Sequence, residues 1–544
     1  MWNLTNKNTF LPWVLSLFFC FLATESNAQT DYSNFSELTN NLKKLQKNNS
    51  GVCKLESLTK TVGGYDIWAL TLSKGNAEDK PAIAIVSGVN GKHILGPEMA
   101  FKIAENILTN HPEILEKTTF YIFPNMSPNA TENYFSTVKS YPSGNAKSTD
   151  DDRDGEKDED AFDDLNKDGL ITLMRIEDVT GNYIKFKDDD RIMVKANIDD
   201  GEIGVYKILS EGIDSDQDGQ FNEDGKGGVI FNKNFSYKFP NFQPGAGDHP
   251  VSEKENRALL DFLYQKWNIY SIITLGPTNN LSTPLKHNAS NAKKRVVTSI
   301  LKDDAELNKF ISEKYNKIIK AKNAPATKEQ KGGFFEWSYF HFGKLAFSTP
   351  GWWVPKFEGD SINKASKNKK VNFLKWAEQE KLSNYFVDWT EIDHPDFPNK
   401  KVEIGGIAPY RMINPPYKMV NSISIKHTNF ILEVAKIQPK IELHNVDVEA
   451  VNGLTRITVD VYNKGLIPTH TEMGKRSRWL RKIKVELSLN KNQEIISGKK
   501  ITLVNSIDGD SSQQFTWLIK GKGSVQLEAG TSHTGTDTAT IKLK

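Results

Sequence analysis

The sequence has 544 residues, of which 38% are hydrophobic and 25% are charged, and its formal net charge is +2. This length allows about two to four domains with cores of their own. A net charge so close to zero argues against nucleic acid or an anionic membrane as a general partner. The charge is unevenly spread, because residues 150–224 are acidic and the stretch KRSRWLRKIK, residues 475–484, is basic.

The N-terminus has the pattern of a secretory signal. Lys7 precedes the apolar run FLPWVLSLFFCFLA, and the small residues Ser26 and Ala28 precede a cleavage point near Ala28. The alternative is a membrane anchor, but the run is short and polar residues follow it. We therefore expect removal of residues 1–28. The mature chain is then secreted, to the periplasm, the cell surface or the medium, without a transmembrane segment.

Cysteine usage excludes a disulfide framework. Cys20 lies in the signal, which leaves Cys53 alone in the mature chain. A single cysteine is more often an inert buried thiol than a nucleophile, so we expect Cys53 to be structural.

The mature chain begins with an α/β pattern. Residues 32–48 predict a helix, with Phe35, Leu38 and Leu42 at helical spacing. Strands are expected at 64–73, 81–89, 118–126 and 269–276, helices at 96–108, 252–267 and within 293–322, and a strand and loop at 343–355.

A long acidic insertion, residues 143–226, interrupts this pattern. It contains three stretches with oxygen-bearing side chains at alternate positions, followed by glycine, which lets a loop wrap a hard cation. No stretch has the bidentate acid of an ordinary EF-hand, and the loops look more like those of dockerins and thrombospondin-type repeats. The alternative is a solvated acidic loop, but the recurrence favours structural calcium. The predicted ligands are Asp150, Asp152, Asp154, Asp158, Asp164, Asn166, Asp168, Asp214, Asp216, Asp218 and Asn222.

The composition changes after about residue 435. Several segments alternate apolar and polar residues, with glycine and asparagine turns between them, which predicts an immunoglobulin-like β-sandwich over residues 436–544. Such a module could dock on the preceding domain, bind carbohydrate or protein, or act as a spacer.

The stretch SGVNGKHILGPE, residues 87–98, follows the apolar run 82–86. A buried strand that opens into a glycine-containing loop ahead of a helix is a common site for α/β chemistry. Read alone, this loop offers Asn90, Lys92 and His93.

In order along the chain, this loop and five later segments resemble the zinc carboxypeptidase family (carboxypeptidase A/B type). SGVNGKHILGPE is similar to the family's zinc loop GGIHGDEVVGRE. The other segments are FPNMSPNATENYF, FNKNFSYKFP, DHPVSEKENRALLDFL, SIITLGP and GGFFEWSYFHFGKLAFST. The resemblance covers residues 32–435. It implies a mixed sheet flanked by helices, an α/β fold, with the acidic calcium-loop insertion and the C-terminal sandwich added.

The residues that the family uses for chemistry are replaced. The resemblance places the three zinc-ligand positions at Asn90, His93 and Gly276, and the general base at Gly351, or at Pro350 if the gap is placed differently. Catalytic zinc needs three protein ligands, an open position for water and a carboxylate to take the proton. Zinc is therefore not expected, and His93 is expected to pack or hydrogen-bond within its loop.

A remnant of the family's substrate site is also implied, at Arg175, Asn232 and Lys233. Lysine keeps the positive charge of the family's arginine but loses its bidentate fork. These three residues could still make an anion-friendly pocket. Trp352 and Trp353, beside Gly351, would fill the old cleft or form an aromatic platform.

Three functions remain open from the sequence. The first is an exported pseudo-peptidase whose cleft serves binding or structure. The second is a metallocarboxypeptidase or other hydrolase with an atypical site, for which His93, Glu98, His249 and Glu253 are the local candidates. The third is a cell-surface module that binds a peptide or glycan through the C-terminal sandwich. The oligomeric state is left open.

Overall fold

The computed structural model describes residues 31–150, 155–158, 160–217, 219–222, 228–359, 364–477 and 479–544. The predicted signal at residues 1–28 lies outside these ranges, as do Asp152, Asp154 and Asp218 of the predicted calcium loops. Within the described ranges, no helix is both long enough and apolar enough to span a bilayer.

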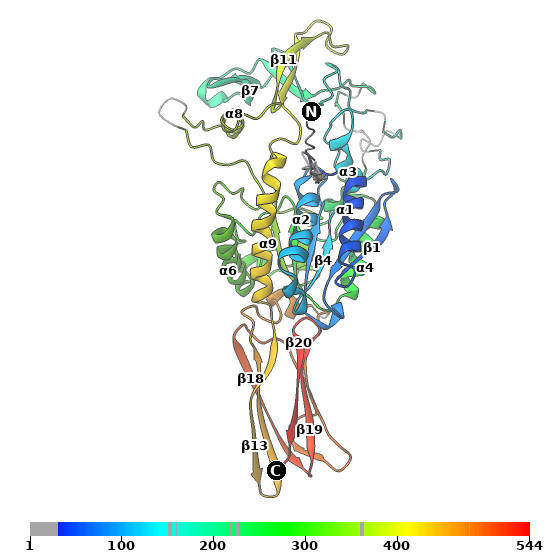
Figure 1. The fold of residues 1–544 in the computed structure, drawn as a ribbon. Coiled ribbons are helices and arrows are strands. Elements are labelled where there is room, and N and C mark those ends of the chain that lie inside the picture. Colours follow the sequence, from blue (N-terminus) through cyan, green and yellow to red (C-terminus); the bar gives the residue numbers. More distant parts are fainter. Residues whose placement is uncertain are drawn as a thin grey trace, which may run out of the picture. The chain divides into compact units, whose positions relative to one another are not determined.

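A six-stranded mixed sheet forms the centre of the α/β part (Figure 1). Its four neighbouring strands β4, β3, β9 and β10 run parallel, and β2 and β1 extend it with antiparallel pairing. In spatial order the strands are β1 (Cys53–Lys60), β2 (Asp66–Leu72), β4 (Thr119–Phe123), β3 (Ala82–Ser87), β9 (Ile269–Leu275) and β10 (Leu345–Thr349).

Both faces of this sheet are buried, because successive side chains of each strand enter different cores. In β3, Ile83 and Ile85 belong to one core, whereas Ala82, Ala84 and Val86 belong to the other. A strand that is covered on both faces reads as a continuous apolar run, as residues 82–86 do. Cys53 is buried in the first core, as expected of a structural cysteine, and burial raises its pKa to about 11.

Helices cover the two faces. The first core is formed with α1, α2, α6, α8 and α9, and the second with α4 and α7. α1 begins where the sequence predicts a helix, with a capping box between Asn34 and Glu37. The expected helix within 293–322 is confined to α6. The helices are α1 (Phe35–Asn48), α2 (Leu95–Asn110), α3 (Pro128–Glu132), α4 (Lys254–Gln265), α5 (Ala289–Ala292), α6 (Lys302–Ile319), α7 (Phe334–Phe340), α8 (Lys369–Gln379), α9 (Val420–Lys436) and α10 (Glu472–Arg476).

A second sheet joins the acidic insertion to a later hairpin, which the sequence patterns do not reveal. All its strands pair antiparallel, and its small core includes Met174, Ile176, Val402 and Ile404. In spatial order the strands are β11 (Phe386–Ile392), β12 (Val402–Ile407), β5 (Leu173–Glu177), β8 (Tyr206–Ser210), β6 (Tyr183–Phe186) and β7 (Asp189–Lys195).

The C-terminal part consists of two antiparallel four-stranded sheets around one core, as the sequence predicts. Trp517, Ile457 and Leu527 are among its buried residues. One sheet contains β13 (Ile441–Val451), β14 (Leu454–Asn463), β18 (Ser511–Lys520) and β16 (Glu494–Ser497). The other contains β17 (Ile501–Val504), β15 (Ile483–Ser488), β19 (Ser524–Thr531) and β20 (Gly535–Lys542).

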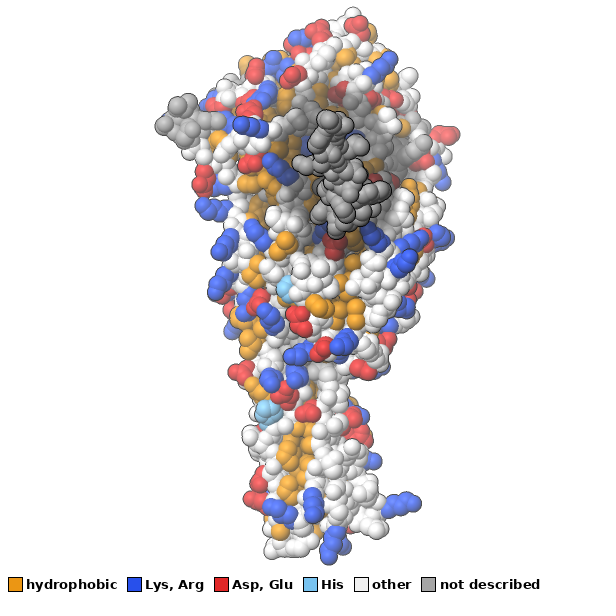
Figure 2. Space-filling model, in the orientation of Figure 1, with side chains coloured by type: hydrophobic (Ala, Val, Ile, Leu, Met, Phe, Trp, Pro, Cys, Tyr) orange, Lys and Arg blue, Asp and Glu red, His pale blue; other side chains and the backbone are white. Residues whose placement is uncertain are grey.

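The basic stretch at residues 475–484 lies against the α/β part. The Trp479 indole stacks on Trp267 with ring centroids 4.5 Å apart, and the Arg481 guanidinium lies 3.9 Å from the Trp267 ring. Nearby, the buried Asp304 carboxylate accepts hydrogen bonds from the backbone N–H groups of Glu472 and Met473. Part of this basic stretch therefore serves internal docking. On the face drawn in Figure 2, lysine and arginine side chains are interspersed with acidic ones.

Candidate functional site

The loop after β3 begins with a tight turn at Gly88. Its φ is +63°, and a Cβ there would lie 2.3 Å from Asn125 Oδ1 and 2.7 Å from Asn125 Cα. Glycine is required by both the backbone conformation and the close approach. The turn carries Asn90 and His93 to the carboxyl end of the parallel strands, where α/β proteins commonly place their sites.

Asn90 is used to hold its own loop. Its side-chain Oδ1 accepts a hydrogen bond from the Lys92 N–H at 3.0 Å, and its carbonyl accepts one from the His93 N–H at 3.0 Å. Asn414 clamps the other side, donating to the Lys92 carbonyl at 2.9 Å and accepting from the Leu95 N–H at 3.1 Å. The Asn90 side chain therefore acts as a turn-forming residue.

His93 is a neutral imidazole in this loop. Burial, with a smaller contribution from the charge of Lys92, lowers its pKa to about 4. Its Nδ1 is buried and has no hydrogen-bond partner among the described residues. The ring is thus in the protonation state that a metal ligand needs, and its neighbours decide whether a metal could bind.

The third ligand position, Gly276, has no room for a side chain. A Cβ there would lie 2.5 Å from Val89 Cγ2, closer than real Cβ contacts come. Val89 is buried and stands next to Asn90 in the zinc-loop segment. An apolar side chain thus fills the space into which a ligand from residue 276 would project.

The general-base position, Gly351, is closed in the same way. A Cβ there would lie 2.6 Å from Met99 Cε and 3.2 Å from Leu95 Cδ2, both on α2. The φ of Gly351 is +75°, which an L residue rarely adopts. A glutamate at this position would meet apolar core and would be strained.

These residues do not fit zinc. An asparagine amide is a poor zinc ligand, Gly276 offers no side chain, and only His93 remains. Across the described ranges, no group of three or more His, Cys, Asp or Glu side chains could hold a metal ion. No reaction step is therefore derived through zinc.

The local candidates for an atypical site are engaged elsewhere. The Glu98 carboxylate accepts hydrogen bonds from the hydroxyls of Ser33, at 2.8 Å, and Tyr417, at 3.1 Å. The Glu253 carboxylate accepts from Asn145 at 2.8 Å. The described contacts bring neither carboxylate to His93.

Asn232 and Lys233 lie in a short 3-10 helix, Phe231–Lys233. The buried Asn232 Oδ1 accepts a hydrogen bond from the N–H of Phe334 at the start of α7, at 2.9 Å, and Lys233 Nζ donates to the Pro244 carbonyl at 3.1 Å. Burial lowers the pKa of Lys92, and the charge of Lys233 lowers it further. Two lysine charges thus act on each other near the loop after β3, and Asn232 makes a contact with α7.

Arg175 lies in β5 of the second sheet. Its Nε donates to the Glu403 carboxylate at 2.7 Å, and its guanidinium lies 4.4 Å from the ring of Trp389. This buried ion pair lowers the pKa of Glu403. The described hydrogen bonds and ring contacts of Arg175 all join strands of the second sheet, so its substrate role stays a prediction.

The second acidic loop, residues 164–172, wraps its side chains around backbone N–H groups. Asp164 Oδ2 accepts from the Gly169 N–H at 2.8 Å, and Asp168 Oδ1 accepts from the Leu170 N–H at 2.8 Å. The buried Glu211 braces this loop, accepting from the N–H groups of Leu165 and Thr172 at 3.0 and 2.9 Å. Burial raises the pKa of Glu211, and these hydrogen bonds partly oppose the increase.

The third loop, residues 214–222, has a matching brace. Asp214 Oδ2 accepts from the Gly219 N–H at 3.0 Å, as Asp164 does from Gly169. The buried Asp160 accepts from the N–H groups of Ser215 and Asn222, the second and ninth residues of the loop. Leu165 and Thr172 are likewise the second and ninth residues of their loop. The carboxylate just before the second loop, Asp160, therefore braces the third loop, and the carboxylate just before the third loop, Glu211, braces the second.

Sequence reasoning missed Asp160 and Glu211. Each stands just ahead of an acidic loop, four residues before Asp164 and three before Asp214. An acidic residue three or four residues ahead of each loop is the available sequence signal. The first acidic loop is described only in part. It includes Asp150 and Asp158, and the Asp158 Oδ1 is buried without a partner in the described residues.

Comparisons with known proteins agree with this geometry in part of the chain. Residues 38–175 match the family model described as zinc carboxypeptidase, and residues 440–542 match a domain of unknown function. A segment of 105 residues is 28% identical to carboxypeptidase SOL1 of Arabidopsis thaliana, covering 18% of this chain and 21% of that protein. The resemblance to zinc carboxypeptidases is thereby confirmed for the N-terminal segment.

Among solved structures, the chain is similar to carboxypeptidase A of Helicoverpa armigera. The identity is 11%, the match covers 76% of this chain and 77% of the other, and the TM-score is 0.41. A structure of bovine thrombin-activatable fibrinolysis inhibitor, in complex with tick carboxypeptidase inhibitor, is 12% identical over 75% of this chain and 97% of the other, with a TM-score of 0.40. Likeness at this level adds nothing to the topology described above.

Proposed function

We propose that this homologue of the zinc carboxypeptidases is an exported, noncatalytic pseudo-peptidase with a binding or structural role. The observation that carries the proposal is steric. Val89 fills the space beside Gly276, and Met99 and Leu95 fill the space beside Gly351. Both positions therefore lack a reactive side chain, and the Cβ of a replacement residue would clash with these apolar side chains.

The chemistry explains why these two positions matter together. Zinc lowers the pKa of its bound water to near 7, and a carboxylate then takes the proton. One ligand and no base at the expected position leave water with its ordinary pKa and nothing aligned to deprotonate it. Loss of one ligand could be repaired by a neighbour, but replacement of all three ligands and the base removes the reaction.

The direct test uses the purified, full-length mature protein. We expect substoichiometric zinc by elemental analysis and no release of C-terminal residues from a mixed panel of peptides. The same measurements on His93→Ala should be unchanged. Chelator-sensitive release of C-terminal residues by the native protein would refute the proposal.

An active hydrolase with an atypical site is the second reading. It requires a cluster that includes His93, and the contacts of Glu98 and Glu253 described above point away from one. A fall in both metal content and hydrolysis in His93→Ala would establish this reading over the first.

The remaining alternative is a surface module that acts through the sandwich. It is favoured by Ile501 and Leu503, which are 47% and 59% exposed on the edge strand β17. Loss of peptide or glycan binding in Ile501→Ser/Leu503→Ser would support it.

We further propose that calcium stabilises the acidic insertion. The support is the repeated arrangement of the second and third loops, in which loop carboxylates and a buried brace converge on the backbone in the same way. Carboxylate-rich loops with glycine at the turn suit a hard cation. Calcium should raise the melting temperature of the native protein, and magnesium should do so less. No change in melting temperature on addition of calcium would contradict this proposal.

A further inference from the structure

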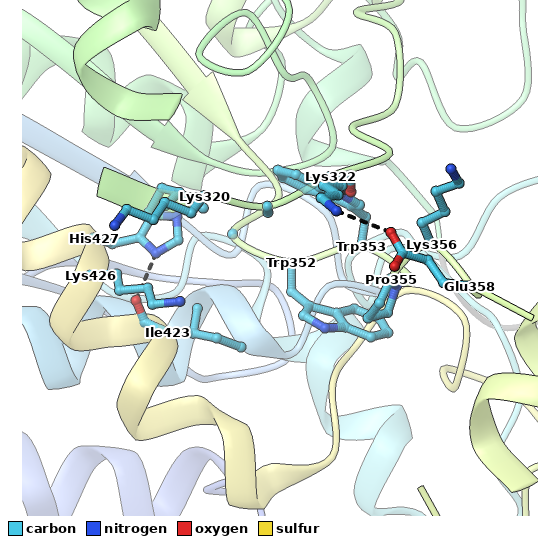
Figure 3. Close-up of a pocket in the computed structure, with 13 residues that line it drawn as sticks. Lys320, Lys322, Trp352, Trp353, Pro355, Lys356, Glu358, Ile423, Lys426 and His427 are labelled. Atoms are coloured by element: carbon cyan, nitrogen blue, oxygen red, sulfur yellow. Dashed lines mark hydrogen bonds and ion pairs between the residues drawn. The ribbon is translucent and has the colours of Figure 1, made fainter. Parts of the chain in front are cut away.

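A cavity of about 350 Å³ lies beside Gly351, between three elements of the α/β part (Figure 3). Its walls are the C-terminal end of α6 at residues 319–322, the loop 351–358 that follows β10, and α9 around Lys426. Residues 90–93 are not among its lining residues, so the cavity is separate from the old zinc loop.

The cavity is strongly positive. Four lysines and one glutamate line it: Lys320, Lys322, Lys356, Lys426 and Glu358. Glu358 pairs with Lys322 at 3.0 Å, and this contact lowers the pKa of the Glu358 carboxyl. Within the described ranges, the other three lysines form no ion pair. Lysines thus outnumber carboxylates among the lining residues, and three of them lack an ion pair with any described residue.

Two tryptophans supply apolar walls. Trp352 is 8% exposed and packs against Trp376, with ring centroids 5.8 Å apart. The Trp353 indole N–H donates to the Lys322 carbonyl at 2.8 Å, which fixes the plane of that ring. Figure 3 shows Trp352 between Lys320 and Lys426 on one side and Lys356 on the other. A ligand in the cavity therefore meets flat apolar surface and positive charge together.

A buried chain of hydrogen bonds fixes the frame of the cavity. The Gly351 N–H donates to Thr349 Oγ1 at 3.1 Å, and the Thr349 hydroxyl lies 2.7 Å from that of Tyr315. His427 Nδ1 lies 2.8 Å from the Ile423 carbonyl, so this nitrogen carries the proton and Nε2 accepts from the Tyr315 hydroxyl at 3.0 Å. Both ring nitrogens are then occupied, and burial lowers the His427 pKa to about 4. The His427 ring is therefore neutral and supports the cavity wall through its hydrogen bonds. The positive charge of the cavity comes from the lysines.

We propose that this cavity binds a small organic polyanion, with an apolar or planar body that carries two or three carboxylate, sulfate or phosphate groups. Three free ammonium groups on separate walls match several acid groups better than one. Lysine carries its charge on a flexible stem and lacks the planar guanidinium with which arginine binds an acid group in a bidentate way. We therefore expect the site to discriminate ligands by their charge more than by the shape of the acid group. The volume falls in the range of small-ligand pockets, about 300–1,000 Å³. Inorganic anions would leave the tryptophan walls uncovered, and neutral rings would leave the charges unmatched.

The test is calorimetric titration of the full-length mature protein with benzene-1,3,5-tricarboxylate. We expect one site per chain, with affinity that falls as the salt concentration rises. Benzene-1,3,5-trimethanol has the same ring without charge, and sodium sulfate has charge without the ring, so neither should bind measurably. Equal binding of the neutral ring, or no binding of the tricarboxylate, would overturn the proposal.

Two double variants locate the site. Lys356→Gln/Lys426→Gln removes two cavity charges, and we expect at least about tenfold weaker binding, or about 1.4 kcal/mol. Lys309→Gln/Lys317→Gln removes two exposed charges of α6 that do not line the cavity, and binding should stay within about twofold. An equal loss in both variants would show nonspecific attraction and would refute a built site.

Two further titrations identify the acid. Benzene-1,3,5-trisulfonate and the corresponding trisphosphate each keep the ring and change the acid group. Tighter binding of one of them assigns the acid type of the natural ligand while it supports the site. Titration reads binding alone, so peptidase activity in the native protein would refute the proposed function without affecting this inference.

Discussion

The loop after β3 and the acidic loops are two regions of one chain in which the sequence suggests metal sites, and their surroundings differ. Gly276 and Gly351 stand where the resemblance implies a zinc ligand and the general base, and Val89, Leu95 and Met99 lie closest to them. In the acidic loops, carboxylates stay in place and also hold backbone N–H groups, as Asp164 and Glu211 do. The side chains near Gly276 and Gly351 contribute packing, whereas the carboxylates of the acidic loops contribute hydrogen bonds to the backbone.

The largest effect should follow from restoring the general base. Gly351→Glu places a Cβ 2.6 Å from Met99 Cε and 3.2 Å from Leu95 Cδ2, in a left-handed backbone. We expect a loss of at least about 4 kcal/mol in the free energy of unfolding, measured by urea denaturation. Gly64→Ala is the matched control, because Gly64 has a φ of +84° with nothing near its Cβ, and should cost only about 1 kcal/mol. Equal losses of stability in the two variants would show that backbone strain, and not the clash with Met99 and Leu95, disfavours a side chain at residue 351.

Arg175→Met should rank next, since it removes the nearest cation from the buried Glu403 carboxylate and leaves only the longer contact with Lys401, at 3.6 Å. We expect a loss of about 3–4 kcal/mol, and recovery of most of it in Arg175→Met/Glu403→Leu. Thermal and urea denaturation would measure both. A stable single variant would mean that the ion pair does not hold the second sheet, and would return Arg175 to the substrate-binding residues.

The loop braces come third. Asp160→Asn and Glu211→Gln each replace a carboxylate that accepts backbone N–H groups, so each should cost about 1–3 kcal/mol. Each should also reduce the calcium-dependent increase in melting temperature. The exposed Asp199→Asn is the control in the same insertion and should change neither value. If the calcium response survives both brace variants, the loops and the braces are not linked.

The smallest effect concerns His93 and is pH-dependent. Its folded pKa of about 4 lies below the ordinary histidine value of 6.5, so the unfolded chain binds the extra proton first as pH falls. The stability that neutral His93 allows is present above pH 6.5 and is lost as pH falls from 6.5 toward 4. As pH falls over this range, the free energy of unfolding of His93→Gln should therefore decrease by about 1–3 kcal/mol less than that of the native protein. The comparison needs unfolding curves for both proteins across the range, and parallel curves would contradict the assignment.

Much of the fold could be predicted from the sequence. The continuous apolar run at 82–86 predicts a strand covered on both faces, and the alternation after residue 435 predicts the sandwich. The second sheet could not be predicted, because its strands β5 to β8 are short and lie in an acidic insertion whose composition suggests loops. In addition, β5 pairs with β12, which lies more than 200 residues further along the chain, so no local sequence pattern reveals this pairing.

The site shows the same limit. Motif order identified Asn90, His93, Gly276 and Gly351 as the positions to inspect, and residue types alone argued against zinc. The filling by Val89 and Met99 is a contact between segments distant in sequence, so only the structure reveals it. The lysines of the cavity also come from three separate elements and form no motif.

The reciprocal braces of the acidic loops have a consequence for how this insertion can change during evolution. Asp160 supports residues 214–222, and Glu211 supports residues 164–172. A deletion of either repeat with its leading residue removes one loop and also the anchor of the loop that stays. We therefore expect natural relatives to carry both repeats or neither, which a survey of insertion lengths among homologues would check.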